Sequence, residues 1–381
     1  MAGSLQLFFY ARMTRAMARQ FFHLSLPAAK RLRQRLLVWF RGHKRDLPWR
    51  RTRDAYRIWL SEVMLQQTRV AAVVPYYERF LKRFPNLRRL ARARREEVLK
   101  LWAGLGYYRR ARDLHAAARR MATRHRAQFP GTLPEALALP GIGRCTAAAV
   151  LSMAYGSLLA VLDGNAARVL ARLGAMRGDL RAPSRWRRLE LAAERLLAPR
   201  APGEWNQAMM ELGATICTPR APRCQQCPVA RWCRAYALGI ADQLPTKRRK
   251  PAAVSVHIAA AVLRDPRGRT LLLPKPRTAQ RNFFSGLWQF PAVETEGDAG
   301  AAVRELLRRQ FGIVAELVPL AAVRHTVTHH RITLWPFLVP VKALPAGTGV
   351  AVRLDRLDGL AVSSATRKLA ARALLSQQTP Q

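Results

Sequence analysis

The spacing of apolar residues divides this chain into a helical part and a part rich in strands. Between residues 30 and 240, apolar positions recur with the period of an α-helix, and Gly and Pro interrupt them. This period predicts helices over 58–80, 95–101, 111–124, 146–154 and 166–173. The first part is therefore expected to be mainly α.

After residue 252 the pattern changes to short apolar runs separated by turn residues. Strands are predicted at 254–263, 270–273, around Leu317 and at 332–339, and helices at 299–310 and 364–375. The expected fold is an all-α domain followed by an α+β domain. The predicted segments are a basic leader at 1–29, a helical domain at 30–240, a basic linker at 241–252 and an α+β domain at 253–376.

Charge changes the picture most. Lys and Arg total 66 against 23 acidic residues, which gives a formal charge of +43. A surplus of this size favours a polyanionic partner such as nucleic acid. Genomic base composition can enrich arginine and alanine, but it explains the shortage of acids less well.

The leader has two interpretations. It has no acidic residue before Asp46, so its composition is similar to that of a mitochondrial transit peptide. The favoured alternative is an over-extended gene start with Met13 or Met17 as initiator, which predicts a cytoplasmic, nucleoid-associated bacterial protein. The longest uncharged run, at 146–162, is too short and too polar for a membrane span, so no membrane association is expected.

Four of the five cysteines lie within seventeen residues, in the spacing C-x6-C-x2-C-x5-C. They are Cys217, Cys224, Cys227 and Cys233. Four thiolates so close in sequence can bind one metal centre. Disulfides are disfavoured because nothing else indicates secretion, whereas tetrahedral zinc and an iron–sulfur cluster stay as even alternatives on chemistry alone.

The segment Leu139-Pro-Gly-Ile-Gly143 precedes an apolar helix, which is typical of a helix–hairpin–helix over 139–155. Glycines at 141 and 143 allow a tight turn whose backbone N–H groups can bind a DNA phosphate. A purely structural turn between two helices is the alternative. Such a hairpin would position the duplex without reading its sequence.

Two acidic residues are candidates for chemistry. Glu62 has Ile58, Trp59, Leu65 and Gln66 as helical neighbours, so no cation pairs with it locally. Desolvation would raise its pKa and suit it to proton donation. Asp163 precedes a helix and is a good N-cap, which is its structural alternative. Together the pair suits N-glycosidic cleavage, in which one acid protonates the base and one carboxylate faces the cationic sugar.

Several motifs together resemble MutY-type A/G-specific adenine DNA glycosylases of the endonuclease III superfamily. They are 47–50 (LPWR), 59–68 (WLSEVMLQQT), 104–108 (GLGYY), 139–143, 162–165 (LDGN), 206–213 (NQAMMELG) and the four cysteines. The resemblance implies a monomeric, monofunctional enzyme that removes adenine opposite 8-oxoguanine or guanine in double-stranded DNA. It also implies that Cys217, Cys224, Cys227 and Cys233 hold a [4Fe-4S] cluster.

The resemblance further assigns roles to single residues. Glu62 would protonate adenine N7 and later activate water, and Asp163 would stabilise or trap the sugar cation. Gln66, Gln67 and Thr68 would contact the strand around the orphan base, and Tyr107 would wedge into the duplex. Trp49, Arg50 and Glu211 would line the adenine pocket. Ordinary core packing is the alternative for Trp49 and Tyr107.

Cys145 departs from the family. An endonuclease III-like bifunctional pyrimidine glycosylase and lyase would need lysine there, whereas MutY-type enzymes usually carry Ser or Tyr. The thiol is expected to pack rather than to react. The bifunctional enzyme and a non-enzymatic iron–sulfur DNA-binding protein are the two alternative functions.

The α+β domain resembles the Nudix-like lesion-recognition domain of the family. It lacks the paired glutamates of a Nudix box, because 303–309 contains one acid, so pyrophosphohydrolase activity is not expected. The family's Phe-Ser-His loop corresponds to Val327, Thr328 and His329. Thr328 and His329 are predicted to contact 8-oxoguanine, whereas Val327 would stack more weakly than the aromatic residue it replaces.

Overall fold

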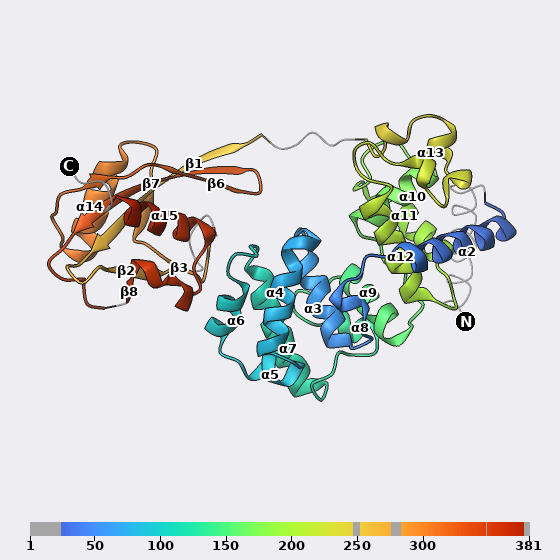
Figure 1. The fold of residues 1–381 in the computed structure, drawn as a ribbon, viewed down its shortest axis with the longest axis horizontal. Helices are drawn as coiled ribbons and strands as arrows, with labels where there is room; N and C mark the ends of the chain where they lie inside the picture. Colours follow the sequence, from blue (N-terminus) through green and yellow to red (C-terminus); the bar gives the residue numbers. More distant parts are fainter. Residues whose placement is uncertain (1–23, 247–251, 276–282, 348, 377–381) are drawn as a thin grey trace, which may run out of the picture. The chain divides into compact units, whose positions relative to one another are not determined.

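The computed structural model describes residues 24–246, 252–275, 283–347 and 349–376 (Figure 1). Most of the predicted leader (1–23) and part of the predicted linker (247–251) lie outside the described residues. The chain divides into two compact units, each described by itself. The first comprises Met1–Tyr77, Asn86–Arg88 and Ala116–Arg249, and the second Glu78–Pro85, Arg89–His115 and Lys250–Gln381.

The first unit is helical. Its helices are α2 (Leu26–His43), α3 (Ala55–Leu65), α8 (Leu133–Leu137), α9 (Arg144–Tyr155), α10 (Gly164–Leu173), α11 (Pro183–Leu196), α12 (Pro202–Thr215) and α13 (Arg234–Ala237), with 3-10 turns η1 (Pro48–Arg50), η2 (Cys224–Gln226), η3 (Ala230–Trp232) and η4 (Ala241–Gln243). Helices α4 (Val70–Arg83), α5 (Leu87–Arg92) and α7 (Arg109–Arg124) contribute residues to both units, and α6 (Arg95–Trp102) belongs to the second. The predicted mainly α part is confirmed.

Side-chain caps explain where several of these helices begin. The Ser25 hydroxyl accepts a hydrogen bond from Ala28 N, and the Asp54 carboxylate accepts from the backbone N–H groups of Tyr56 and Arg57. Each cap satisfies backbone donors that have no partner in the first turn of the helix. Gly156, at φ 71°, ends α9 in the left-handed conformation that glycine adopts without strain.

The prediction of one helix over 58–80 is wrong. Helix α3 ends at Leu65 and α4 begins at Val70. Gln67 takes a positive φ of 58° between them. The apolar period continues across this break, so periodicity alone could not reveal it, and no Gly or Pro marks the turn.

Helix α12 is central to the first unit, where it packs against α2, α9 and α10. Two glycines permit close approach. A Cβ at Gly203 would lie 2.5 Å from Ser152 O on α9, and one at Gly213 would lie 2.7 Å from Asn165 Cβ on α10. The buried core around these helices includes Leu36, Phe40, Leu170 and Trp205. These contacts fix the helices whose ends carry the candidate site.

The second unit is built around a sheet. Its strands are β1 (Val254–Arg264), β2 (Arg269–Pro274), β3 (Trp288–Gln289), β4 (Ala292–Glu294), β5 (Val318–Pro319), β6 (Val323–Val327), β7 (His330–Pro340) and β8 (Val350–Arg353), with α14 (Ala299–Phe311), η5 (Leu354–Gly359) and α15 (Ser364–Leu375). Strands β1 and β7 are parallel from Val254↔His330 to Arg264↔Pro340. The sheet order is β4-β1-β7-β5, with β6 paired to β7, and a smaller sheet has the order β3-β2-β8.

Alternate residues of β1 face two separate cores. Val256, Ala260 and Val262 pack in the core that includes α15, whereas Ala259 and Leu263 pack in the core that includes α14. A strand covered on both faces is expected to be continuously apolar, as 258–263 is. The predicted α+β character of this domain is confirmed. Within the described ranges, no helix combines the length and apolar character needed to cross a bilayer.

Candidate active site

A cavity of about 530 Å³ lies in the helical unit. Its walls come from η1, α3, the turn after α3, α9, α10 and α12. The predicted site residues that line it are Glu62, Asp163, Trp49, Arg50, Gln66, Gln67, Thr68, Glu211 and Gly143. The structure therefore brings the two candidate catalytic carboxyl groups into one cavity, although about a hundred residues separate them in sequence.

Glu62 lies on α3 between the buried residues Ser61 and Val63 and is itself partly buried. Desolvation is the main effect that raises the pKa of its carboxyl group, and the negative charge of Asp163 raises it further. The Arg50 cation opposes both effects. The net result is a pKa of about 7, so much of the Glu62 population holds a proton at neutral pH, as a general acid requires.

Asp163 is the N-cap of α10. Its Oδ1 accepts a hydrogen bond of 2.7 Å from Ala166 N, and its Oδ2 accepts one of 3.0 Å from Asn165 Nδ2. These two bonds fix the orientation of the carboxylate at the N-terminus of the helix. Asp163 therefore does cap the helix, as the structural alternative predicted. The same position also places its carboxylate on the cavity wall.

Glu211 is a second glutamate of the cavity, and it is fully buried on α12. Its carboxylate accepts hydrogen bonds from Arg45 and Arg50 at 2.7–2.8 Å. Burial alone would raise its pKa, but the hydrogen bonds from Arg45 and Arg50 and the charge of Arg50 outweigh burial and lower the pKa to about 2. Trp49 is 8 % exposed and packs edge-on against Tyr77, so it is both a core and a cavity residue.

The hairpin before α9 has the geometry that the glycines predicted. Gly141 takes φ 71°, and Gly143 is the N-cap of α9, with both glycines exposed. A Cβ at Gly143 would have no atom within 4 Å, so open space lies in front of this helix N-terminus. The backbone donors there are available to an anion.

Comparison with known proteins identifies both parts of the chain. Residues 60–194 match the family model of the HhH-GPD superfamily of base excision DNA repair proteins, and residues 259–372 match the NUDIX domain model. An adenine DNA glycosylase of Homo sapiens is 35% identical over 416 residues, which cover 91% of this chain and 75% of the human protein. This chain belongs to the adenine DNA glycosylase family.

Two further comparisons extend this finding. An adenine DNA glycosylase of Arabidopsis thaliana is 33% identical over 406 residues, with 89% of this chain and 64% of the plant protein covered. The solved structure of a thermostable thymine-DNA glycosylase is 29% identical, with a TM-score of 0.51, and covers 55% of this chain and 97% of that one. The resemblance to MutY-type glycosylases inferred from the sequence is confirmed.

Cys145 is a third titratable group near the two candidate carboxyl groups. It lies on the first turn of α9 and lines the cavity with Glu62 and Asp163. Burial is the main cause that raises the pKa of its thiol to about 12, and the two carboxylates raise it further, whereas a hydrogen bond with the Leu162 backbone opposes them. The thiol is therefore protonated at neutral pH and is a weak nucleophile.

In this glycosylase the four predicted metal-binding cysteines line one small cavity, together with Arg172. The buried guanidinium of Arg172 donates from Nη1 to Cys217 Sγ at 3.1 Å and to Thr218 O at 2.7 Å. Its Nη2 is buried and has no hydrogen-bond partner among the described residues. An unsatisfied cationic donor beside four sulfur atoms fits an anionic group with further acceptors, such as a cluster with inorganic sulfides.

No set of three or more His, Cys, Asp or Glu side chains in the described ranges is arranged around one point for a single metal ion.

Sequence reasoning missed four polar residues of this glycosylase site. Arg45, Asn165 and Gln207 line the main cavity, and Arg172 lies beside the cysteines. Asn165 and Gln207 lie within two of the motifs that resemble the family, and these motifs could have indicated them as site residues. Arg45 and Arg172 are two among many arginines, and only the fold pairs them with their partners.

The remaining predicted contacts lie in the second unit. Tyr107 is 44 % exposed, has φ 50°, and stacks with the Arg110 guanidinium at 5.3 Å. Thr328 and His329 form the exposed turn between β6 and β7, where Thr328 takes φ 55°. Val327 is partly buried against the core beside α15.

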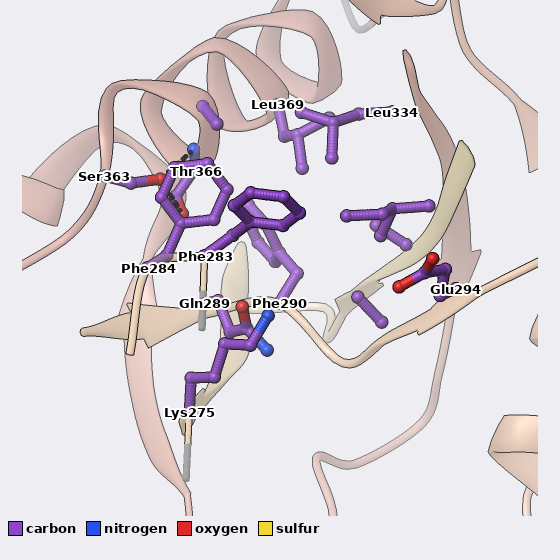
Figure 2. Close-up of a pocket in the computed structure, with 14 residues that line it drawn as sticks. Lys275, Phe283, Phe284, Gln289, Phe290, Glu294, Leu334, Ser363, Thr366 and Leu369 are labelled. Atoms are coloured by element: carbon purple, nitrogen blue, oxygen red, sulfur yellow. Dashed lines mark hydrogen bonds between the residues drawn. The ribbon is translucent and has the colours of Figure 1, made fainter. Parts of the chain in front are cut away.

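The Nudix-like domain of this glycosylase has its own pocket of about 80 Å³ (Figure 2). Phe283, Phe284 and Phe290 form its apolar interior, and Lys275 and Glu294 supply charged groups. Burial lowers the pKa of Lys275, and the nearby Glu294 carboxylate opposes this effect. On α14, Glu305 pairs with Arg308, so the one acid of the 303–309 segment is engaged in an ion pair.

Proposed function

We propose that this protein removes adenine mispaired with 8-oxoguanine or guanine in duplex DNA by hydrolysing the N-glycosidic bond. One observation carries this proposal: Glu62 and Asp163 line the same cavity, and Glu62 has a pKa near 7. Family membership supports the assignment to base excision repair and to DNA as substrate. The choice of mispair and the roles of single residues belong to the proposal.

The reaction needs a proton donor for the leaving base. In the proposal Glu62 gives its proton to adenine N7, the C1′–N9 bond breaks, and the bonding electrons leave with adenine. The sugar is left with oxocarbenium character. Glu62 is then a carboxylate and can take a proton from the water that adds to C1′, which restores the starting state.

The sugar cation needs an anion at a fixed position. Asp163 meets this need because Ala166 N and Asn165 Nδ2 hold its two oxygen atoms in place before the substrate arrives. A preorganised charge stabilises the transition state without reorganisation during the reaction. Asp163 would act by electrostatic stabilisation or by transient covalent attachment to C1′.

A lyase step is not part of the proposal. The cationic side chains on the described lining of the cavity are Arg45 and Arg50, and neither supplies the amine that a Schiff base requires. Cys145 stands at the position where an endonuclease III-like lyase would need lysine. The product would therefore be an intact abasic strand.

Adenine must leave the base stack to reach Glu62, at a cost of roughly a few kcal/mol. The hairpin at Gly141 and Gly143 would bind the backbone phosphates, and the turn at Gln66–Thr68 would face the orphan base. Thr328 and His329 are exposed and able to hydrogen-bond, which supports a contact with 8-oxoguanine. The smaller Val327 would contribute less stacking than an aromatic residue.

A [4Fe-4S] cluster held by Cys217, Cys224, Cys227 and Cys233 is part of this proposal. The buried Arg172 donors beside the four thiols support it. The bound cluster would supply a fixed anionic core that orders the cysteine loop for DNA contact. Iron and sulfide analysis of the purified protein tests this point, and zinc in place of iron would overturn it.

The decisive experiment is a strand-cleavage assay on duplexes with adenine opposite 8-oxoguanine, with and without alkali. We expect cleavage only after alkali, because the enzyme leaves an abasic site and no nick. A thymine glycol duplex serves as the competing substrate. Cleavage of that duplex without alkali, with a borohydride-trapped crosslink, would favour the bifunctional alternative. Duplex binding without base release from either substrate would favour the non-enzymatic one.

A further inference from the structure

Glu211 uses all of its acceptor positions inside the protein. Its Oε1 accepts from Arg45 N at 3.1 Å and Arg45 Nε at 2.8 Å, and its Oε2 accepts from Arg45 Nη2 at 2.7 Å and Arg50 Nη2 at 2.8 Å. An ionised carboxylate offers about four lone-pair sites. With four donors in place and a fully buried side chain, Glu211 has no free site for a hydrogen bond from adenine.

Arg50 is fixed by its surroundings. Its Nη1 donates to Arg45 O at 3.0 Å, its Nη2 donates to Glu211, and its guanidinium lies 5.4 Å from the Phe40 ring centroid. Its side chain is 11 % exposed. Arg50 lines the same cavity as Glu62 and favours the charged form of that carboxyl group.

A cation close to Glu62 works against a general acid, because it stabilises the deprotonated form. Arg45 and Arg50 alone would carry a charge of +2, and the Glu211 carboxylate reduces the net charge of the three residues to +1. The buried Glu211 carboxylate thus compensates one of the two arginine cations that line the cavity together with Glu62. Of these three groups, Arg50 is the charge that acts on the Glu62 carboxyl group, and Glu211 holds it by a hydrogen bond of 2.8 Å.

We propose that Glu211, clamped by Arg45 and Arg50, is a positioning residue that keeps the Arg50 cation away from Glu62 and so lets Glu62 hold its proton. This inference rests on the proposed glycosylase function. Arg45 belongs to the same cluster, because it donates hydrogen bonds to both oxygen atoms of the Glu211 carboxylate. The other titratable groups that face Glu62 are Asp163 on α10 and Cys145 on α9.

The test is the pH profile of single-turnover adenine release by the full-length protein. Release falls at high pH where Glu62 loses its proton, and this basic limb reports the Glu62 pKa. In Glu211→Gln the two arginines are uncompensated, so the limb moves down by about one pH unit. The rate at pH 8 then falls about ninefold, whereas the rate at pH 6 falls only about twofold. Glu211→Asp keeps the charge and should return the limb to its wild-type position.

Arg45→Met is the matched variant, and it should move the limb the other way. Removing Arg45 leaves Glu211 with Arg50 alone and brings the net charge to zero. The limb therefore moves up, and the ratio of the rates at pH 8 and pH 6 rises several-fold. The Arg45 side chain is 40 % exposed, so this variant is expected to fold even if Glu211→Gln does not.

Two results would overturn the inference. One is an equal loss of rate at every pH in both variants, which would indicate a purely structural role. The other is a shift of the basic limb in the same direction in Glu211→Gln and in Arg45→Met. If instead the wild-type protein releases no adenine at any pH, the proposed function fails, and this outcome is distinct from an active wild type whose limb does not respond to the variants.

Discussion

Glu62 and Glu211 line the same cavity, yet their surroundings move their pKa values in opposite directions. Glu62 has a negative neighbour in Asp163 and no hydrogen-bonded cation among the described residues, and its pKa is about 7. Glu211 accepts from two arginines, and its pKa is about 2. Burial alone does not decide the protonation state of a carboxyl group. Hydrogen bonds and charge from arginines outweigh desolvation at Glu211, whereas desolvation prevails at Glu62.

The largest expected effect comes from removing the acid of this pair. Glu62→Gln keeps the shape of the side chain but cannot donate a proton, so adenine release should fall by roughly 10²–10⁴-fold. Single-turnover assays on the 8-oxoguanine duplex measure this loss. Binding of the same duplex, measured by gel shift, is the control and should be retained. If Glu62→Gln released adenine at the wild-type rate, this result would contradict the assignment of Glu62 as the acid.

The next effect separates the charge of Asp163 from its role as a cap. Asp163→Asn keeps a good N-cap but loses the charge, so release should fall by roughly 10²-fold. The basic limb of the pH profile should also move down, because the Asp163 charge raises the Glu62 pKa.

Asp163→Ala is the matched control, since it loses the cap as well. It should unfold more easily than Asp163→Asn by about 1 kcal/mol, seen as a lower melting temperature. Equal melting temperatures for the two variants would show that the cap contributes nothing measurable.

A smaller effect should appear in the free energy of unfolding, with opposite signs for the two glutamates. The folded pKa of Glu211 lies below its ordinary value of 4.5. Its stabilisation is therefore present above pH 4.5 and is lost as pH falls toward 2. Glu211→Gln should be less stable than wild type at pH 7, by at most roughly 3 kcal/mol.

For Glu62 the folded pKa lies above 4.5, so wild-type stability decreases as pH rises from 4.5 to about 7. Glu62→Gln lacks this penalty and should be more stable than wild type at pH 8, by at most roughly 3 kcal/mol, and equal to it below pH 4.5. Melting temperatures at pH 8 and pH 4.5 measure both differences. Destabilisation by both variants at pH 8 would show that packing, and not charge, controls the site.

The smallest effect is expected at Cys145. Its thiol has a pKa of about 12 and so supplies no nucleophile at neutral pH. Cys145→Ser should change the rate of adenine release by no more than a few-fold, measured beside wild type at pH 7. A loss comparable to that of Glu62→Gln would show that the sulfur takes part in the reaction.

The sequence predicted the fold class from its apolar periodicity and indicated both carboxylates as candidates, whereas their catalytic roles came from the resemblance to the family. Glu62 stood out because no cation lies one helical turn away, and Asp163 because it follows an uncharged run and precedes a helix. The break after Leu65 was missed because the apolar period continues through it. The clamp on Glu211 could not be foreseen, because Arg45 lies 166 residues from its partner and the chain has 66 basic residues to choose from.

Gly213 sets a limit on the shape of this cavity. Its bare Cα lets α12 rest against Asn165, the residue that holds the Asp163 carboxylate. A single methyl group at position 213 would need the space that Asn165 fills, so the start of α10 would have to move away. The distance between α12, which carries Glu211, and the Asp163 carboxylate at the start of α10 is thus governed by a residue that has no side chain.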